Sequence, residues 1–181
     1  MDNVVERVKS VLKNLDISGY RMGESDGRVL ILLRDGDAVS RLISALKEAG
    51  LHATYSEPVP DYYEWKEQVN RRDIYVPEDL NEIADNLWKL REDIDEWKLV
   101  VDVPDEVVDL LLLGDRREIY FQLKKWGWDR RLEVVYFIEW FETYYGLLNF
   151  WREAIENMGA NPFGRYYLVK VEDATSEGSQ G

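Results

Sequence analysis

The sequence predicts an α+β protein in which a small α-β-β-α-β unit, residues 1–57, precedes a mainly helical, aromatic-rich domain, residues 58–173, that ends in a final strand. Three observations predict this class. Helical and strand-like hydrophobic spacings alternate up to residue 57, and helical spacing dominates afterwards. Pro58 and Pro60 interrupt the pattern between the two parts. All seven tryptophans follow this break.

The N-terminal unit opens with a helix and a hairpin. Apolar residues recur at three- and four-residue spacing and predict a helix over residues 3–15. Two strands follow, over residues 20–23 and 28–34. The turn between them contains Asp26 and Gly27, a pair that readily adopts the positive φ angles of tight hairpins.

A second helix and a third strand complete this unit. Asp37 can cap a helix that runs to about Ala49, and Gly50 is its natural stop. Residues 51–57 alternate in hydrophobicity and predict a strand. The resulting α-β-β-α-β order hints at a split βαβ unit.

The second part is predicted to be mainly helical. Pro77 and Pro104 each stand at a predicted helix start, and Asp129 can cap a long helix. Residues 117–126 fit a strand and a helix equally well. The predicted elements are helices over residues 61–70, 78–95, 104–113 and 130–158, strands over residues 97–103 and 166–171, and a flexible tail over residues 174–181.

The composition limits the classes of function. The net charge is −13, and residues 58–128 alone carry 18 acids and 10 bases. This charge disfavours nucleic acid and anionic membranes as partners, and it favours a basic one. With no cysteine, disulfides and thiol nucleophiles are excluded. We expect a cytoplasmic protein with no membrane span, and the 33% charged fraction is typical of thermophile proteins.

Catalytic chemistry has little support in the sequence. His52 is the only histidine, and on its predicted strand it points to solvent while Leu51, Ala53 and Tyr55 point inward. The acidic clusters at residues 92–96 and 102–109 lie at helix ends, where acids have a structural role. No phosphate-binding loop or nucleophile elbow is found. We therefore expect no cofactor and no metal.

One short pattern resembles a nuclease signature. Pro104-Asp105 is followed by Gln122-Leu123-Lys124, a degenerate form of the Pro-Asp…(Asp/Glu/Gln)-x-Lys motif. The resemblance covers about four residues and implies a metal-dependent nuclease in which acids hold Mg²⁺ and the lysine orients the attacking water. That family places its acid on or beside a strand, whereas Asp105 is predicted to be helical.

The aromatic residues are the strongest pattern. Two apolar stripes run along the predicted helix over residues 130–158 and leave only a narrow polar face. Such a helix is either the core of a helical domain or an interface. The stripes consist of Val134, Phe137, Ile138, Phe141, Tyr145 and Leu148, and of Tyr136, Trp140, Tyr144, Leu147 and Trp151.

Two smaller aromatic groups are the candidate partner-binding sites, because they stand at segment edges where exposure is expected. The first follows the proline break, and the second combines rings with cations and could stack on single-stranded bases. Its arginines could equally pair with neighbouring acids. The candidate residues are Tyr62, Tyr63 and Trp65 in the first group, and Trp126, Trp128, Arg130 and Arg131 in the second.

These features favour a non-enzymatic protein–protein interaction or adaptor module with an acidic helical surface. Its partner is expected to be a protein, a basic one or a second copy of the chain. The surface could also act as a nucleic-acid mimic, with carboxylates in place of phosphates. The alternatives are nucleic-acid binding through residues 124–131 and the metal-dependent nuclease.

Overall fold

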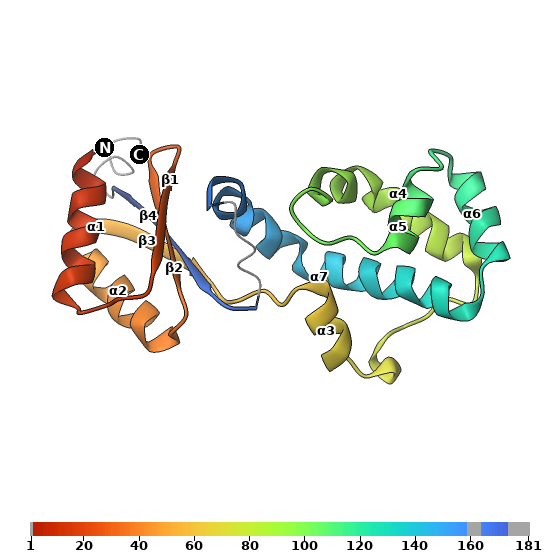
Figure 1. The fold of residues 1–181 in the computed structure, drawn as a ribbon, viewed down its shortest axis with the longest axis horizontal. Coiled ribbons are helices and arrows are strands. Elements are labelled where there is room, and N and C mark those ends of the chain that lie inside the picture. Colours follow the sequence, from red (N-terminus) through yellow and green to blue (C-terminus); the bar gives the residue numbers. More distant parts are fainter. Residues whose placement is uncertain (1, 159–163, 174–181) are drawn as a thin grey trace. The chain divides into compact units, whose positions relative to one another are not determined.

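A computed structural model describes residues 2–158 and 164–173 (Figure 1). It confirms the predicted α+β class. Contacts divide the chain into two compact units: unit 1 consists of Met1–Val59 and Leu147–Gly181, and unit 2 of Pro60–Gly146. This division differs from the predicted ranges 1–57 and 58–173, because the end of the long helix and the final strand group with the N-terminal elements. The predicted tail, residues 174–181, lies outside the described residues.

Unit 1 begins with the predicted helix and hairpin. Helix α1 (Asp2–Asn14) precedes strands β1 (Arg21–Ser25) and β2 (Arg28–Leu33). Asp26 and Gly27 have φ angles of +48° and +78°, so the predicted turn is confirmed.

Helix α2 (Gly36–Glu48) and strand β3 (Leu51–Ser56) also follow the prediction. The cap is different: Asp35, not Asp37, precedes the helix, and its carboxylate accepts a hydrogen bond from the Asp37 N–H at 2.9 Å. An aspartate at either position could cap the helix. Asp35 is the cap because its backbone is extended, as an N-cap residue requires.

Strand β4 (Tyr167–Asp173) lies in the middle of the sheet, whose order is β1-β2-β4-β3. It pairs antiparallel with both β2 and β3. Strands β2 and β3 are therefore parallel to each other and separated by β4. The unit β2-α2-β3 is thus a split βαβ unit, as its order hinted.

Helices α1 and α2 cover one face of this sheet (Figure 1). Along β2, alternate side chains point to opposite faces. Val29, Ile31 and Leu33 therefore belong to the core beneath the two helices, while Leu30 and Leu32 point the other way and are also buried. The sheet accordingly needs a cover on its second face as well.

The C-terminal part of helix α7 (Trp128–Met158) provides this cover. The indole N–H of Trp151 donates to the hydroxyl of Ser56 at 3.0 Å. Glu153 forms ion pairs with Arg28 at 3.0 Å and with Lys170 at 3.8 Å. Both faces of the sheet are thus covered, one by α1 and α2 and the other by the C-terminal part of α7.

Unit 2 consists of helices, with the N-terminal part of α7 as its centre. Polar side chains of Asp61, Asn70, Asp79 and Asp115 cap the helices that follow them. No helix in the described ranges is long and apolar enough to cross a bilayer. The other elements are α3 (Tyr62–Gln68), the 3₁₀ helix η1 (Arg71–Asp73), α4 (Leu80–Trp97), α5 (Asp105–Leu111) and α6 (Arg116–Lys125).

Three predictions about these helices need correction or completion. The predicted strand over residues 97–103 is wrong, because buried Trp97 ends α4 and its carbonyl accepts from the N–H groups of Val100 and Val101 in a turn. Residues 117–125 are helical and Trp126 ends the helix, with Ile119 and Leu123 buried on one helical face. Helix α4 begins after the cap at Asp79 rather than at Pro77.

Candidate interaction surface

The long aromatic helix is mainly core. Phe137, Trp140, Phe141 and Trp151 are all buried. The indole N–H of Trp140 donates to the carbonyl of Pro60 at 3.0 Å, which satisfies its polar atom. Leu147 is an exception and is exposed. Both predicted stripes therefore serve mostly to pack the helix within its own chain.

Two of the three aromatics in the first candidate group are also buried, which corrects the expectation that the group is exposed. The ring of Tyr62 lies 5.4 Å from Phe137, and that of Trp65 lies 6.2 Å from Tyr136. The cause is helical spacing: Tyr62 and Trp65 are three positions apart on α3, so both face α7. Tyr63 points away from this contact.

Glu133 holds α3 against α7 through two polar contacts. The Tyr62 hydroxyl donates to its carboxylate at 2.7 Å, and Lys66 forms an ion pair with the other oxygen. Burial and the neighbouring Glu133 carboxylate strongly raise the pKa of Tyr62. The sequence analysis did not single out Glu133, and no local motif marks it, because its partners are about seventy positions away.

Tyr63 is the exposed member of the first group, with 49% of its surface accessible. Its ring packs edge-on against Tyr62 at 5.0 Å. Partial burial raises the pKa of Tyr63, and so do the surrounding carboxylates. These carboxylates are Asp102, Asp105, Glu133 and Glu106, in decreasing order of effect.

In the second group, the arginines have partners within the chain. The Arg130 guanidinium lies over the Trp126 ring at 4.1 Å and reaches Asp109 at 3.4 Å. Arg131 donates to the carbonyls of Leu123 and Lys124 at 2.7 and 3.1 Å, and so caps the C-terminal end of α6.

The expected exposure of Trp126 is therefore wrong, because packing and the stacked arginine bury its ring. Trp128, by contrast, is 55% exposed. The predicted pairing of the arginines with a neighbouring acid is confirmed for Arg130. Lys124 and Lys125 are exposed and remain the accessible cations of the group.

Helix α5 interacts electrostatically with one residue of each group, Tyr63 and Arg130. The carboxylates of Asp105 and Glu106, in its first turn, help to raise the pKa of Tyr63. One turn later, Asp109 forms an ion pair with Arg130. Asp102 precedes the helix, and its charge also raises the pKa of Tyr63. We call Tyr63 with Asp102, Asp105, Glu106 and Asp109 the α5 acidic edge.

The carboxylates of this edge are unequally neutralised. Asp109 has Arg130 as its partner. Within the part of the chain that the structure describes, neither Asp102 nor Asp105 has a basic side chain at ion-pairing distance, and both are exposed. Unit 2 has 22 acids and 12 bases, a net charge of −10, whereas unit 1 has a net charge of −3. The edge thus presents unpaired negative charge on the more acidic unit.

The geometry gives the nuclease resemblance no support. Asp105 lies in the first turn of α5, not on or beside a strand, and Lys124 lies in the last turn of α6. Among the described residues, no three histidine, aspartate or glutamate side chains are grouped as a metal site.

The orientation predicted for the third strand is partly right. His52 is exposed as expected, but Tyr55 is also exposed, although it was expected to point inward. Ser56 is buried, because the end of the strand lies under Trp151.

Comparison with protein-family models, curated protein sequences and solved structures gives no match to this chain.

Proposed function

We propose that the protein is a non-enzymatic interaction module that binds a basic protein partner through the α5 acidic edge. The observation that carries this proposal is the half-exposed ring of Tyr63 together with the exposed, unpaired carboxylates of Asp102 and Asp105, whose charges raise the pKa of Tyr63. A lysine or arginine side chain fits such a site, because an aromatic face and a carboxylate both attract a cation. The proposal includes the expected cytoplasmic setting.

The charge of unit 2 supports the same partner class. A net charge of −10 over residues 60–146 steers a basic partner toward this unit and slows an anionic one. Carboxylates on a helix edge can also stand where a partner expects phosphates, so a nucleic-acid-binding protein belongs to the same class of basic partner.

Nucleic-acid binding by the chain itself has less support. Arg130 and Arg131, the two arginines on which that alternative depended, are engaged by Asp109 and by the carbonyls at the end of α6. Self-association through the aromatic helix also loses support, because Trp140 and Trp151 are buried within their own units.

Fluorescence anisotropy with a labelled lysine- and arginine-rich dodecapeptide tests the proposal. We expect D102N/D105N to weaken binding about thirty-fold, since each unpaired surface charge contributes about 1 kcal/mol to a close pair and the two together about 2 kcal/mol. We expect Tyr63→Ala to weaken it about three-fold through loss of the cation–π contact.

The matched control is E67Q/E118Q. Glu67 and Glu118 are exposed acids of unit 2 that lie outside the α5 acidic edge, and the control changes the net charge by the same amount. We expect its affinity to stay within about two-fold of the unmodified protein. Equal losses in the two double variants would show that only net charge matters, and would contradict a defined binding edge.

A further inference from the structure

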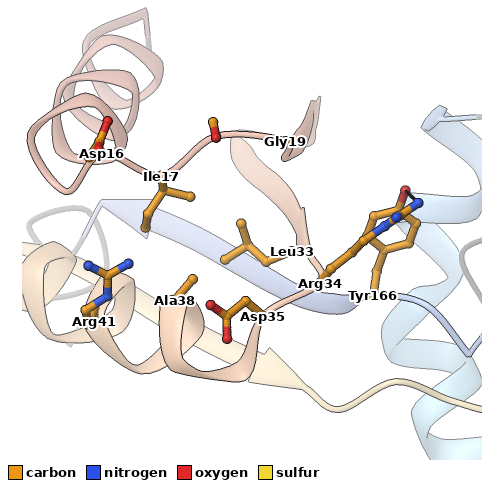
Figure 2. Close-up of a pocket in the computed structure, with 10 residues that line it drawn as sticks. Asp16, Ile17, Gly19, Leu33, Arg34, Asp35, Ala38, Arg41 and Tyr166 are labelled. Atoms are coloured by element: carbon orange, nitrogen blue, oxygen red, sulfur yellow. Dashed lines mark hydrogen bonds between the residues drawn. The ribbon is translucent and has the colours of Figure 1, made fainter.

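Unit 1 contains a solvent-open hollow of about 420 Å³ that no element of the proposed function uses. The loop between α1 and β1, the end of β2, the start of α2 and Tyr166 form its walls. The volume lies within the range of small-molecule sites. Figure 2 shows Arg41 at one end of the hollow and Arg34 with Tyr166 at the other.

Apolar side chains and one carboxylate, that of Asp35, occupy the middle of the hollow (Figure 2). Ile17, Leu33 and Ala38 lie between the two cationic ends (Figure 2). The lining thus mixes apolar and polar groups, so that the apolar part can contribute burial and the polar groups can fix the orientation of a ligand.

The Tyr166 end of the hollow is electrostatically positive. Arg34 donates to the Tyr166 hydroxyl at 3.3 Å, and its guanidinium lies 5.2 Å from the centre of the ring. The hydrogen bond from Arg34, with the charges of Arg34, Arg21 and Arg165, lowers the pKa of Tyr166. The charges that act most strongly on this hydroxyl are therefore all guanidinium groups.

Most of these cations have no acidic partner. In the described ranges, Arg21, Arg41 and Arg165 form no ion pair, although the chain has a net charge of −13. Two carboxylates also line the hollow, those of Asp16 and Asp35. That of Asp35 is already engaged in capping α2. Two guanidinium groups, those of Arg34 and Arg41, and two carboxylates therefore line the hollow, and Arg21 and Arg165 add positive charge near the Tyr166 hydroxyl.

We propose that this hollow binds a small organic anion, a phosphate ester or carboxylate on an apolar body. Arg34 and the Tyr166 hydroxyl bind the anionic group, since the planar guanidinium fork matches both acid groups. Arg41 adds a second positive charge from the other end, and the body of the ligand covers Leu33 and Ala38. This site is separate from the α5 acidic edge and binds a ligand of opposite charge.

Titration calorimetry with the full chain tests this proposal, with phenyl phosphate and benzoate as probes and benzylamine as the cationic comparison. We expect at least one of the two anions to bind with a Kd of about 1 mM and benzylamine not to bind. The tighter of the two anions identifies the preferred acid group. If benzylamine binds as well as both anions, the proposed charge preference is wrong.

Arginine variants locate the binding. We expect Arg34→Gln and Arg41→Gln each to weaken the bound anion about ten-fold, the value for loss of one charge-assisted hydrogen bond. The control is Lys47→Gln, an exposed cation in the last turn of the same helix as Arg41, and it should leave the affinity unchanged. Arg34→Gln should also raise the pKa of Tyr166, which ultraviolet titration measures.

Two results would overturn the proposal. One is the absence of binding heat with either anion at about ten times the expected Kd. The other is unchanged affinity in Arg41→Gln, a variant of an exposed side chain whose fold circular dichroism can check independently.

Discussion

The two units pack around one helix in different ways. In unit 1 the end of α7 lies on the sheet face that carries Leu30 and Leu32, and an ion cluster of Arg28, Glu153 and Lys170 joins helix and sheet. In unit 2 the start of α7 packs against aromatic rings such as Tyr62, and one carboxylate, Glu133, holds the neighbouring helix.

The two units also differ in how far their charged side chains are buried and paired. In unit 1, Lys170 is mostly buried and lies 4.4 Å from the centre of the Phe150 ring, and burial lowers the pKa of Lys170. In unit 2, exposed acids without partners gather at α5. The charges of Glu153 and Lys170 are thus paired within unit 1, whereas Asp102 and Asp105 of the α5 acidic edge have no basic side chain at ion-pairing distance among the described residues.

The largest expected effect tests the aromatic core of unit 2. Trp140→Ala removes a buried indole from contacts with Phe137 and Phe141 and leaves the Pro60 carbonyl without its donor. We expect the free energy of unfolding to fall by about 4 kcal/mol. Trp128→Ala, at an exposed ring, should change it by less than about 0.5 kcal/mol. Urea denaturation measures both, and equal losses would contradict the division of aromatics into core and surface.

A smaller effect tests the carboxylate that joins α3 to α7. Tyr62→Phe removes the hydroxyl that donates to Glu133, and we expect a loss of about 2 kcal/mol, the value for a hydrogen bond to a charged group. Tyr63→Phe, next to it and exposed, should cost far less.

The same tyrosine predicts a pH dependence. The folded-state pKa of Tyr62 lies above its ordinary value of 10.0, so the folded protein retains a proton that the unfolded chain releases. The contribution of Tyr62 is therefore present below pH 10 and is lost as the pH rises above it. Stability curves of the unmodified protein and of Tyr62→Phe should converge at alkaline pH, and parallel curves would show that Tyr62 does not titrate as described.

The smallest effect concerns the point where α7 passes from one unit to the other. Gly146 has no atom within 4 Å of an added Cβ and lies in the helix interior, next to the division between the units. Gly146→Ala should raise the free energy of unfolding by about 1 kcal/mol, because alanine loses less backbone entropy in a helix. A decrease would mean that the helix is not continuous at this point.

Much of the fold could be predicted because its signals are local. Helical spacing predicted α1, α2 and α7, and the Asp26-Gly27 pair predicted the hairpin turn. The place of β4 between β2 and β3 depends on pairing across more than a hundred residues, which no local pattern contains. The grouping of the end of α7 with the N-terminal elements follows from the same pairing.

The candidate surface could be predicted only in part, for a similar reason. Tyr63 and Trp128 are exposed as expected, but Trp126 is covered by Arg130, and Arg131 binds carbonyls of a different helix. Whether a residue at a segment edge is exposed depends on which part of the chain packs over it. The local sequence does not indicate that tertiary contact. The sequence showed that residues 102–109 are acidic, but only the fold brings them beside Tyr63.

The most direct test of the central claim is chemical-shift mapping of the ¹⁵N-labelled protein during titration with the basic dodecapeptide. If the α5 acidic edge is the binding site, amide signals of Tyr63 and of residues 102, 103 and 105–109 should shift first and furthest, and D102N/D105N should require a correspondingly higher peptide concentration for the same shifts. Shifts spread evenly over the acidic helices of unit 2, or centred on the exposed acids of α4, would contradict the account.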